Sequence, residues 1–240
     1  MDRQQMQSLN SRTKEENSLY FAATLMLMLI CNRLIFLLGH FLTLGTYHWN
    51  LNLPADAKIP FLPWTVIFYN GMCLWWLYIY WLMAHRDRKE ANRFFCTLLM
   101  SKAVSFLFFV LFPTSISRPE LNGNSIWIVM LQILYRLDTP DNLFPSIHCI
   151  IGWTCWLGVR GKRDISFFLR ATSFLLAVAV CISTLTVRQN VILDVFAGIL
   201  LSEICYSFSD WSVFREFYSQ VVRLLFQSFT QCRDAIIKTK

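Results

Sequence analysis

The chain has 240 residues, of which 55% are hydrophobic, 16% aromatic and only 15% charged, and its formal net charge is +7. Soluble domains carry about 25% charged residues, so this composition excludes a disordered, collagen-like or ordinary soluble protein. The apolar residues come in long runs, which predicts a polytopic membrane protein. The positive charge is then interpreted as a topology signal between these runs, and nucleic acid is not expected as a partner.

Six apolar runs approach the length of about 20 residues that a membrane-spanning helix needs. They cover residues 19–44, 64–83, 94–113, 143–159, 167–187 and 191–208. The fourth is the shortest. No internal repeat or low-complexity linker divides them, so one all-α bundle of six transmembrane helices is predicted over residues 19–208, after a polar segment at residues 1–18.

The predicted orientation follows from the positions of Lys and Arg. Fifteen of them lie in the N-terminal segment, in the second and fourth connections and in the tail, whereas four lie in the first, third and fifth connections. The positive-inside rule therefore places both termini in the cytoplasm. All seven prolines fall in or beside the outer connections, so irregular backbone is expected on the outer face. A bacterial plasma membrane is the expected location, since no organelle address is found.

Residues 209–240 are predicted to form a cytoplasmic amphipathic tail. Large apolar residues recur there at steps of three and four residues: Trp211, Phe214, Tyr218, Val221, Val222, Leu225 and Phe229. This period is typical of a helix that lies in the membrane interface.

Three polar clusters far apart in sequence are predicted to meet at the outer face. The first holds Arg118, the second Ser146 and His148, and the third Arg188 and Asp194. Ionisable residues near membrane spans are functional candidates, because an unpaired charge is costly there. The two arginines suit a phosphate, and Ser146, at the start of a predicted helix, adds a neutral donor.

The same clusters contain a possible acid and a possible positioning residue. His148 can donate a proton to a leaving alkoxide near neutral pH. Asp194 lies four residues after Asn190, so both share one face of a helix and the carboxylate can orient residue 190. Each residue also has a structural interpretation, such as a snorkelling arginine or a helix N-cap. No metal-ligand spacing occurs on this face, and no metal or cofactor is expected.

These motifs resemble the phosphatidic acid phosphatase type 2 superfamily of membrane lipid phosphatases and phosphotransferases. The resemblance covers residues 111–198: an Arg-Pro pair at Arg118, a Pro-Ser-x-His block ending at His148, and the position four residues before Asp194. It implies that Arg118 and Ser146 bind phosphate, that His148 protonates the leaving group and that Asp194 orients a nucleophile. The form Phe-Pro-Ser-Ile-His is similar to the inositol phosphorylceramide synthase branch, which moves a headgroup between lipids.

The chain departs from that pattern at four positions. The expected lysine falls on Leu111, the expected second arginine on Thr184, and the expected glycine on Ile147. The fourth is Asn190, where the family has its nucleophilic histidine. A carboxamide cannot form a phosphoenzyme, so the unchanged family mechanism predicts an inactive chain.

Three interpretations of Asn190 stay open. First, it is a natural feature of a protein that binds lipid phosphate without turnover; second, it is a substitution that stops an active enzyme. Third, His40 or His48, near the outer face, acts as the nucleophile instead. His85 is predicted on the cytoplasmic side and is excluded. The resulting hypothesis is a membrane lipid phosphatase or phosphotransferase-type protein, inactive as written, whose partners are membrane lipids. The alternative is a non-catalytic lipid-binding or transport protein.

Overall fold

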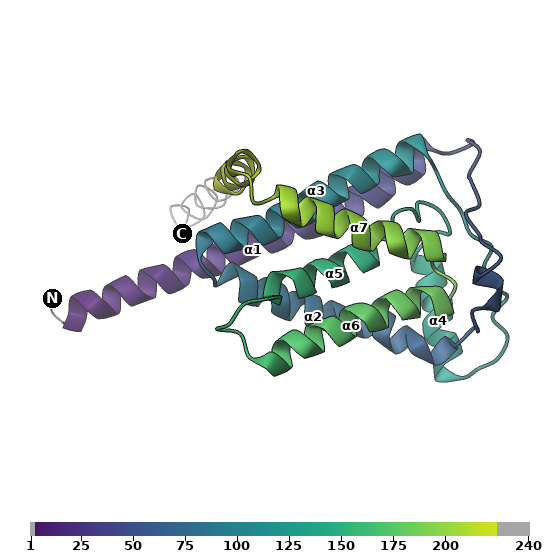
Figure 1. Ribbon diagram of the computed structural model, residues 1–240, viewed down its shortest axis with the longest axis horizontal. Helices are drawn as coiled ribbons and strands as arrows, with labels where there is room; N and C mark the ends of the chain where they lie inside the picture. Colours follow the sequence, from purple (N-terminus) through teal and green to yellow (C-terminus); the bar gives the residue numbers. More distant parts are fainter. Residues whose placement is uncertain (1–2, 225–240) are drawn as a thin grey trace, which may run out of the picture.

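The computed structural model describes residues 3–224, which form helices joined by loops with no β-strand among them. The helices are α1 (Arg3–Leu42), η1 (Asp56–Lys58), η2 (Pro63–Thr65), α2 (Val66–Ala84), α3 (Arg88–Leu111), α4 (Ile126–Leu137), α5 (Ile147–Val159), α6 (Phe167–Thr186), α7 (Ile192–Phe208) and a last helix at Ser212–Leu224 (Figure 1). The predicted all-α class is therefore confirmed.

Helix α5 is the centre of the bundle. It packs against α2, α3, α6 and α7, while α1 lies along α3 and α2 (Figure 1). Most of its residues are apolar and buried, as expected for a helix that is surrounded on all sides. Gly152 permits the close approach of α6, because a Cβ there would lie 2.8 Å from the Val180 side chain.

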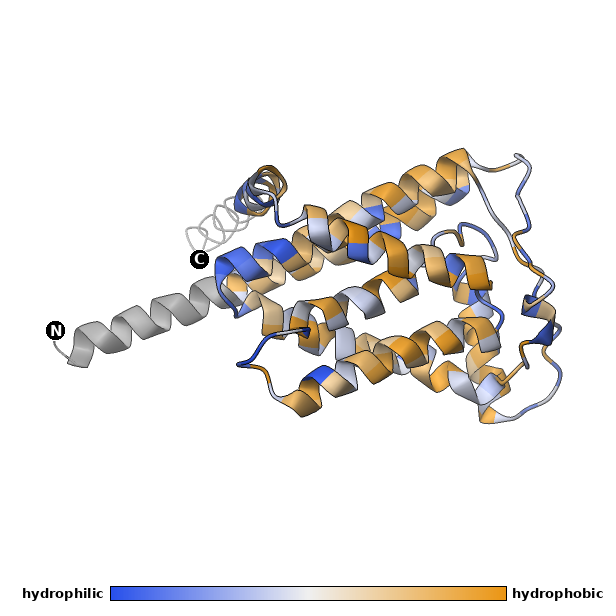
Figure 2. Cartoon of the chain, viewed as in Figure 1, coloured by the Kyte–Doolittle hydropathy of each residue, from blue (hydrophilic) through white to orange (hydrophobic). Residues whose placement is uncertain are grey.

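Within residues 3–224, four helices are long and apolar enough to cross a membrane: Ser18–Leu42, Pro63–Ala84, Arg88–Leu111 and Phe167–Thr186. A fifth crossing is possible if α7 and Ser212–Leu224, which meet at an angle of 94°, form one bent span; α5 is shorter. Large apolar side chains are exposed along these helices, and hydrophobic residues dominate the bundle (Figure 2). These features fit an integral membrane protein, as predicted.

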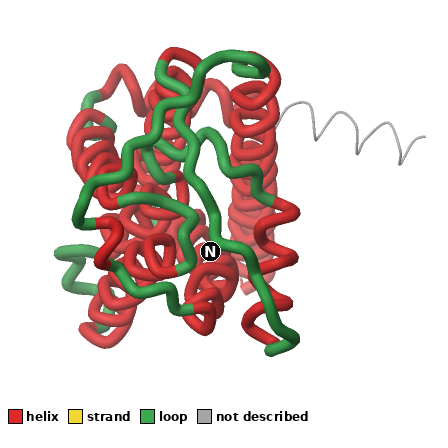
Figure 3. Tube along the Cα trace, turned by 90° about the vertical axis from the view of Figure 1, so that its right-hand side faces the viewer, coloured by secondary structure: helices red, strands yellow, loops and turns green. Residues whose placement is uncertain are grey.

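The connections are grouped at the two ends of the bundle as the sequence predicts. At one end, Arg86 after α2 bonds Asp164 of the α5–α6 connection, and Lys162 Nζ lies 2.6 Å from Glu90 Oε1. At the other end, Leu62 N donates to Thr186 O at 3.1 Å. Loops run across that second end, which faces the viewer in Figure 3.

Helix α4 lies at this second end and was not predicted. Ser125 caps its start by accepting a hydrogen bond from Ile128 N, and Leu131 and Leu134 are buried. These two leucines pack in a small cluster with Val66 and Tyr69 of α2. At 12 residues, α4 is too short for a span, so a search for long apolar runs passes over it.

The predicted amphipathic tail is helical over Ser212–Leu224. Tyr218 and Val222 are buried in the main core, where the Tyr218 ring stacks on Phe95 at 6.4 Å between centroids. Its apolar face therefore packs at least partly on the bundle, and its place in the membrane interface stays a prediction. Leu225 and Phe229 lie outside the described residues.

Candidate functional site

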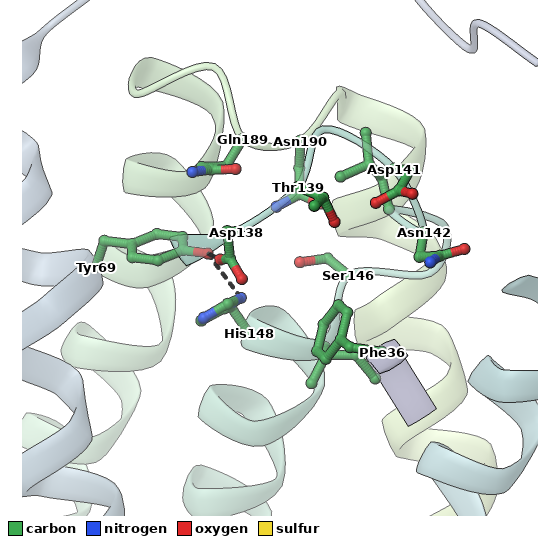
Figure 4. Close-up of a pocket in the computed structure, with 12 residues that line it drawn as sticks. Phe36, Tyr69, Asp138, Thr139, Asp141, Asn142, Ser146, His148, Gln189 and Asn190 are labelled. Carbon is green, nitrogen blue, oxygen red and sulfur yellow. Dashed lines mark hydrogen bonds between the residues drawn. The ribbon is translucent and has the colours of Figure 1, made fainter. Parts of the chain in front are cut away.

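A polar pocket opens at the loop-covered end of the bundle. It has about 310 Å³ of empty space, its open mouth included. Its lining residues are Phe36, Tyr69, Asp138, Thr139, Asp141, Asn142, Leu143, Ser146, Ile147, His148, Gln189 and Asn190 (Figure 4). Three of the predicted site residues, Ser146, His148 and Asn190, are therefore brought together. We call this space the polar pocket.

The start of α5 lines the polar pocket and is bonded to the start of α7. Ser146 is the N-cap of α5, and its Oγ accepts a hydrogen bond from Cys149 N at 3.5 Å. Its backbone N donates to Asp194 O at 3.1 Å, which joins the two helix starts. The Ser146 hydroxyl also lies within hydrogen-bond reach of the Cys149 side chain, so its proton can go to that sulfur or to a ligand.

His148 is held by a chain of hydrogen bonds. Tyr69 Oη donates to Asp138 Oδ2 at 3.0 Å and lies 3.0 Å from His148 Nδ1. Tyr69 has one hydroxyl proton, which goes to the carboxylate, so Nδ1 of His148 must donate to the Tyr69 oxygen. In the neutral ring the Nε2 atom then carries the lone pair. His148 acts as an acid only when Nε2 is also protonated.

Asn190 reaches the polar pocket from the turn between α6 and α7. Its backbone N and that of Gln189 both donate to Thr184 O, at 3.1 and 2.9 Å. The Asn190 residue is only 7% exposed, and its amide makes no hydrogen bond in the described part of the chain. Figure 4 shows Asn190, Asp138 and Ser146 converging on the same space from three segments. An unpaired amide at this place is available to a ligand.

Asp194 does not line the polar pocket. Its Oδ2 accepts a hydrogen bond from Val191 N at 2.8 Å and so caps the first turn of α7. No hydrogen bond joins it to Asn190 among the described residues, and its Oδ1 is buried without a partner. The carboxylate is thus partly used by its own helix, which spacing alone does not reveal.

Arg118 is used by the backbone around the polar pocket. Its two terminal nitrogens donate to the carbonyls of Tyr135, Asp138 and Thr139 and to Gln189 Oε1, at 2.5–3.2 Å. Its guanidinium also lies 4.5 Å from the Tyr135 ring centroid. All four terminal N–H groups are thereby accounted for. Arg118 holds the segment after α4 against the α6–α7 turn.

Arg188 also binds backbone carbonyls, on the other side of the α6–α7 turn. It donates to Asp56 O at 2.9 Å and to Ile59 O at 2.7 Å, which ties the first outer loop to the turn. Arg188 and Arg118 line a second, more open pocket of about 730 Å³ together with Ser117. The two predicted phosphate-binding arginines therefore line this second pocket and not the polar pocket, although Arg118 bonds residues that line the polar pocket.

The charge of the polar pocket differs from the expected anion cradle. Among the described residues, no Lys or Arg side chain lines it, whereas the carboxylates Asp138 and Asp141 do. Carboxylates attract cations and hydrogen-bond donors, while the Arg118 guanidinium bonds three residues of this lining, Asp138, Thr139 and Gln189, without lining the pocket itself. In this arrangement the polar pocket suits a hydroxyl- or amine-bearing group.

A histidine with an orienting acid borders the polar pocket. His40 Nδ1 lies 2.5 Å from Asp141 Oδ2, and Phe36, one turn earlier on α1, lines the pocket. Sequence spacing gave His40 no acid, because Asp141 follows it by 101 residues. His48, by contrast, contacts the carbonyl of Thr46, and neither histidine lines the pocket itself.

Arg118→Gln is expected to destabilise this end of the fold. A neutral amide cannot replace the four charge-assisted hydrogen bonds of Arg118, each of which contributes roughly 1.5–3 kcal/mol to stability when it is buried. Because Arg118 is partly exposed, their combined contribution is smaller than four times this value. We expect a loss of about 2–3 kcal/mol in the free energy of unfolding in detergent. Tyr135, whose ring the Arg118 guanidinium contacts, should keep its own hydrogen bond to Val187 O in this variant, because burial raises the pKa of its hydroxyl to about 12 and keeps it protonated. An unchanged unfolding curve would contradict the structural role of Arg118.

Comparison of the chain with protein-family models, with curated proteins and with solved structures returned no match. No group of three or more His, Cys, Asp and Glu side chains in the described part of the chain is placed to hold a metal ion.

Proposed function

We propose that this chain is an integral membrane protein of the lipid phosphatase and phosphotransferase type, which binds a lipid headgroup in the polar pocket and does not transfer its phosphoryl group. One observation carries the proposal: Ser146, His148 and Asn190, which come from two separate motifs, line one pocket. Buried polar side chains from separate segments rarely meet in a membrane protein unless they serve a ligand.

The proposal includes six membrane crossings, with α5 and the α7 region completing the four long spans. Both termini then lie in the cytoplasm and the polar pocket faces the outer side, with a bacterial plasma membrane as the proposed location. The excess of Lys and Arg in the connections at the opposite end supports this orientation. A pocket at the outer interface is within reach of lipid headgroups from the bilayer.

The chemistry of an active site of this type defines what is missing. A histidine at position 190 would attack phosphorus through a ring nitrogen while the bond from phosphorus to the leaving alcohol breaks. His148, protonated on Nε2, would give its proton to that alcohol. Water or an acceptor lipid would then take the phosphoryl group from the ring. Asn190 cannot form the first bond, so binding is the function that remains.

A second candidate is a non-catalytic lipid-binding or transport protein. The observation that favours it is the pair of pocket carboxylates, Asp138 and Asp141, with no basic side chain beside them in the described lining. Such a pocket binds a headgroup through amine or hydroxyl donors rather than through phosphate oxygens. The two candidates differ in what a histidine at position 190 would do.

The test uses the purified chain in nanodiscs with phospholipids labelled in the headgroup. We expect saturable binding of a headgroup with an amine or hydroxyl, and no release of labelled phosphate. Asp138→Asn should weaken binding about tenfold, since a charge-assisted hydrogen bond is worth roughly 1.5–3 kcal/mol. Glu120→Gln is the control, because it removes the same charge from an exposed position at this end.

Two outcomes would contradict the proposal. Binding that Asp138→Asn and Glu120→Gln leave equally intact places the headgroup elsewhere. Phosphate release by the unmodified chain would show that a nucleophile other than residue 190 is present. If His40→Gln then abolished that release, His40 with Asp141 would be the substitute, since they are already in contact.

A further inference from the structure

Lys102 is a buried cation near the middle of a membrane-spanning helix. It is 2% exposed and lies on α3, eight residues after Phe94 and nine before the last helical residue, Leu111. Its Nζ donates to Met28 O at 3.0 Å. An ammonium carries three donors, and a buried charge at this depth is costly without a partner of opposite sign.

No carboxylate of the described residues pairs with Lys102. The side chain does not reach a membrane surface either, because Met28 is itself ten residues inside the span Ser18–Leu42. Snorkelling, the usual solution for a lysine in a membrane, is therefore not the arrangement found here. The positive charge stays within the hydrocarbon region.

Lys102 is one of the residues that line a groove between α1 and α3, which lie side by side (Figure 1). The groove has about 510 Å³ of open space and is otherwise apolar, with Leu34, Leu38 and Phe106 in its walls. Leu34 and Leu38 are 46% and 45% exposed, so the groove opens on the surface that would face lipid. The small side chain of Ala103, exposed in its lining, would let a neighbouring backbone approach closely.

A second positive charge lies on α1 outside the groove lining. Arg33, next to Leu34 in α1, is exposed within the span Ser18–Leu42 and forms no ion pair in the described part of the chain. Two cations within one pair of spans are costly in hydrocarbon, and a partner that brings negative charge into the membrane would lower this cost.

We propose that the groove between α1 and α3 is the docking site for a transmembrane helix of a partner protein that carries one Asp or Glu near its middle. Lipid headgroups place their negative charges at the membrane surfaces, roughly 15 Å from the centre of a 30 Å hydrocarbon core. An acid at the depth of Lys102 must therefore be carried by a polypeptide span. The Lys102 ammonium would pair with this acid, while the leucines pack against the partner helix.

A second copy of this chain does not supply the acid from its described spans. In α7, Asp194 caps its own helix through Val191 N. Glu203, in the same helix, accepts hydrogen bonds from Trp153 and Arg160. The occupant is therefore a different membrane protein.

The proposal can be tested with designed peptides in phosphatidylcholine vesicles. A polyleucine transmembrane peptide with a single central Glu, and the same peptide with Leu there, are titrated against the labelled chain, and association is measured by energy transfer. We expect the Glu peptide to bind at least tenfold tighter than the Leu peptide, which corresponds to about 1.4 kcal/mol. Lys102→Met should remove this preference, and Lys102→Glu should restore binding for a peptide with a central Lys.

The controls separate the groove from other cations and from loss of folding. Lys102→Met is expected to fold at least as well as the parent chain, because it replaces an unpaired buried charge by an apolar side chain of similar length. Arg170→Met, in the first turn of α6, should leave the preference intact. Equal binding of the Glu and Leu peptides would overturn the proposal. A preference for the Glu peptide that survives Lys102→Met but is lost in Arg33→Gln would also overturn it. The same holds for a preference that added oleate abolishes.

Discussion

Asn190→His is expected to convert the chain into an enzyme that releases phosphate or transfers a headgroup from labelled phospholipids in detergent. Loss of one member of a catalytic unit commonly lowers the rate by a factor of about 10³ to 10⁶, so restoring it should raise turnover by at least about 10³. The side chain of residue 190 faces the polar pocket beside Ser146. Asp194 Oδ1 has no partner among the described residues, and a hydrogen bond to it from the new histidine is part of this prediction.

Two further variants decide whether this gain follows the proposed chemistry. Asn190→His combined with His148→Ala should lose most of the gained turnover, because no group then protonates the leaving alcohol. Asn190→Gln keeps the amide and should stay silent. If Asn190→His is silent although the lipid still binds, the non-catalytic candidate replaces the first. A gain that does not depend on His148 would show that its assignment as the acid is wrong.

The product of the Asn190→His variant distinguishes the two branches of the resemblance. Free phosphate indicates that water is the acceptor, whereas a new labelled lipid indicates transfer to a lipid hydroxyl. Ile147, which stands where simple phosphatases have glycine, lines the polar pocket beside His148. Because the Phe-Pro-Ser-Ile-His form resembles the synthase branch, transfer to a lipid is the expected product.

Gly198→Ala is expected to force α7 away from the start of α5, next to the polar pocket. A Cβ at Gly198 of α7 would lie 2.9 Å from Ser146 O and 3.2 Å from Cys149 Cβ. The first contact is with backbone, which cannot turn aside, so α7 must move away from the start of α5. Overpacking of this kind typically destabilises a protein by about 1–3 kcal/mol. The bond from Ser146 N to Asp194 O should also be lost.

The measurement is unfolding in detergent together with lipid binding. Gly71→Ala is the matched control, because this glycine lies inside α2 with no atom within 4 Å of the added carbon. There the change should be neutral or stabilise by up to about 1 kcal/mol through the helix propensity of alanine. Equal stability of the two variants would mean that α5 and α7 are less closely packed than described.

Much of the fold follows from the sequence because a membrane leaves few choices. Each of the six predicted runs contains a helix, and Ser146 was predicted as a helix start and is the N-cap of α5. Backbone groups in hydrocarbon must bond within their own segment, so length and apolarity are sufficient signals. The meeting of the first, third and fifth connections at one end follows from the same alternation of crossings.

The partners of each polar side chain could not be predicted in this way. Tyr69 lies within an apolar run and Asp138 follows the unpredicted helix α4, yet together they hold His148. The pairing of His40 with Asp141 joins residues 101 positions apart. No period or spacing connects such residues, because the contact depends on how separate helices are placed around a common end.

The sequence by itself determined that this chain is a bundle of apolar helices and which end of it gathers the polar motifs, since both depend on local composition. Only the tertiary structure decided which charges enter the polar pocket. Arg118 and Arg188 were expected to face a phosphate, but backbone carbonyls of the loops take their donors. A buried carbonyl without a donor is costly, and the guanidinium groups are placed to satisfy several at once. The carboxylates of Asp138 and Asp141 are left to define what the polar pocket can bind.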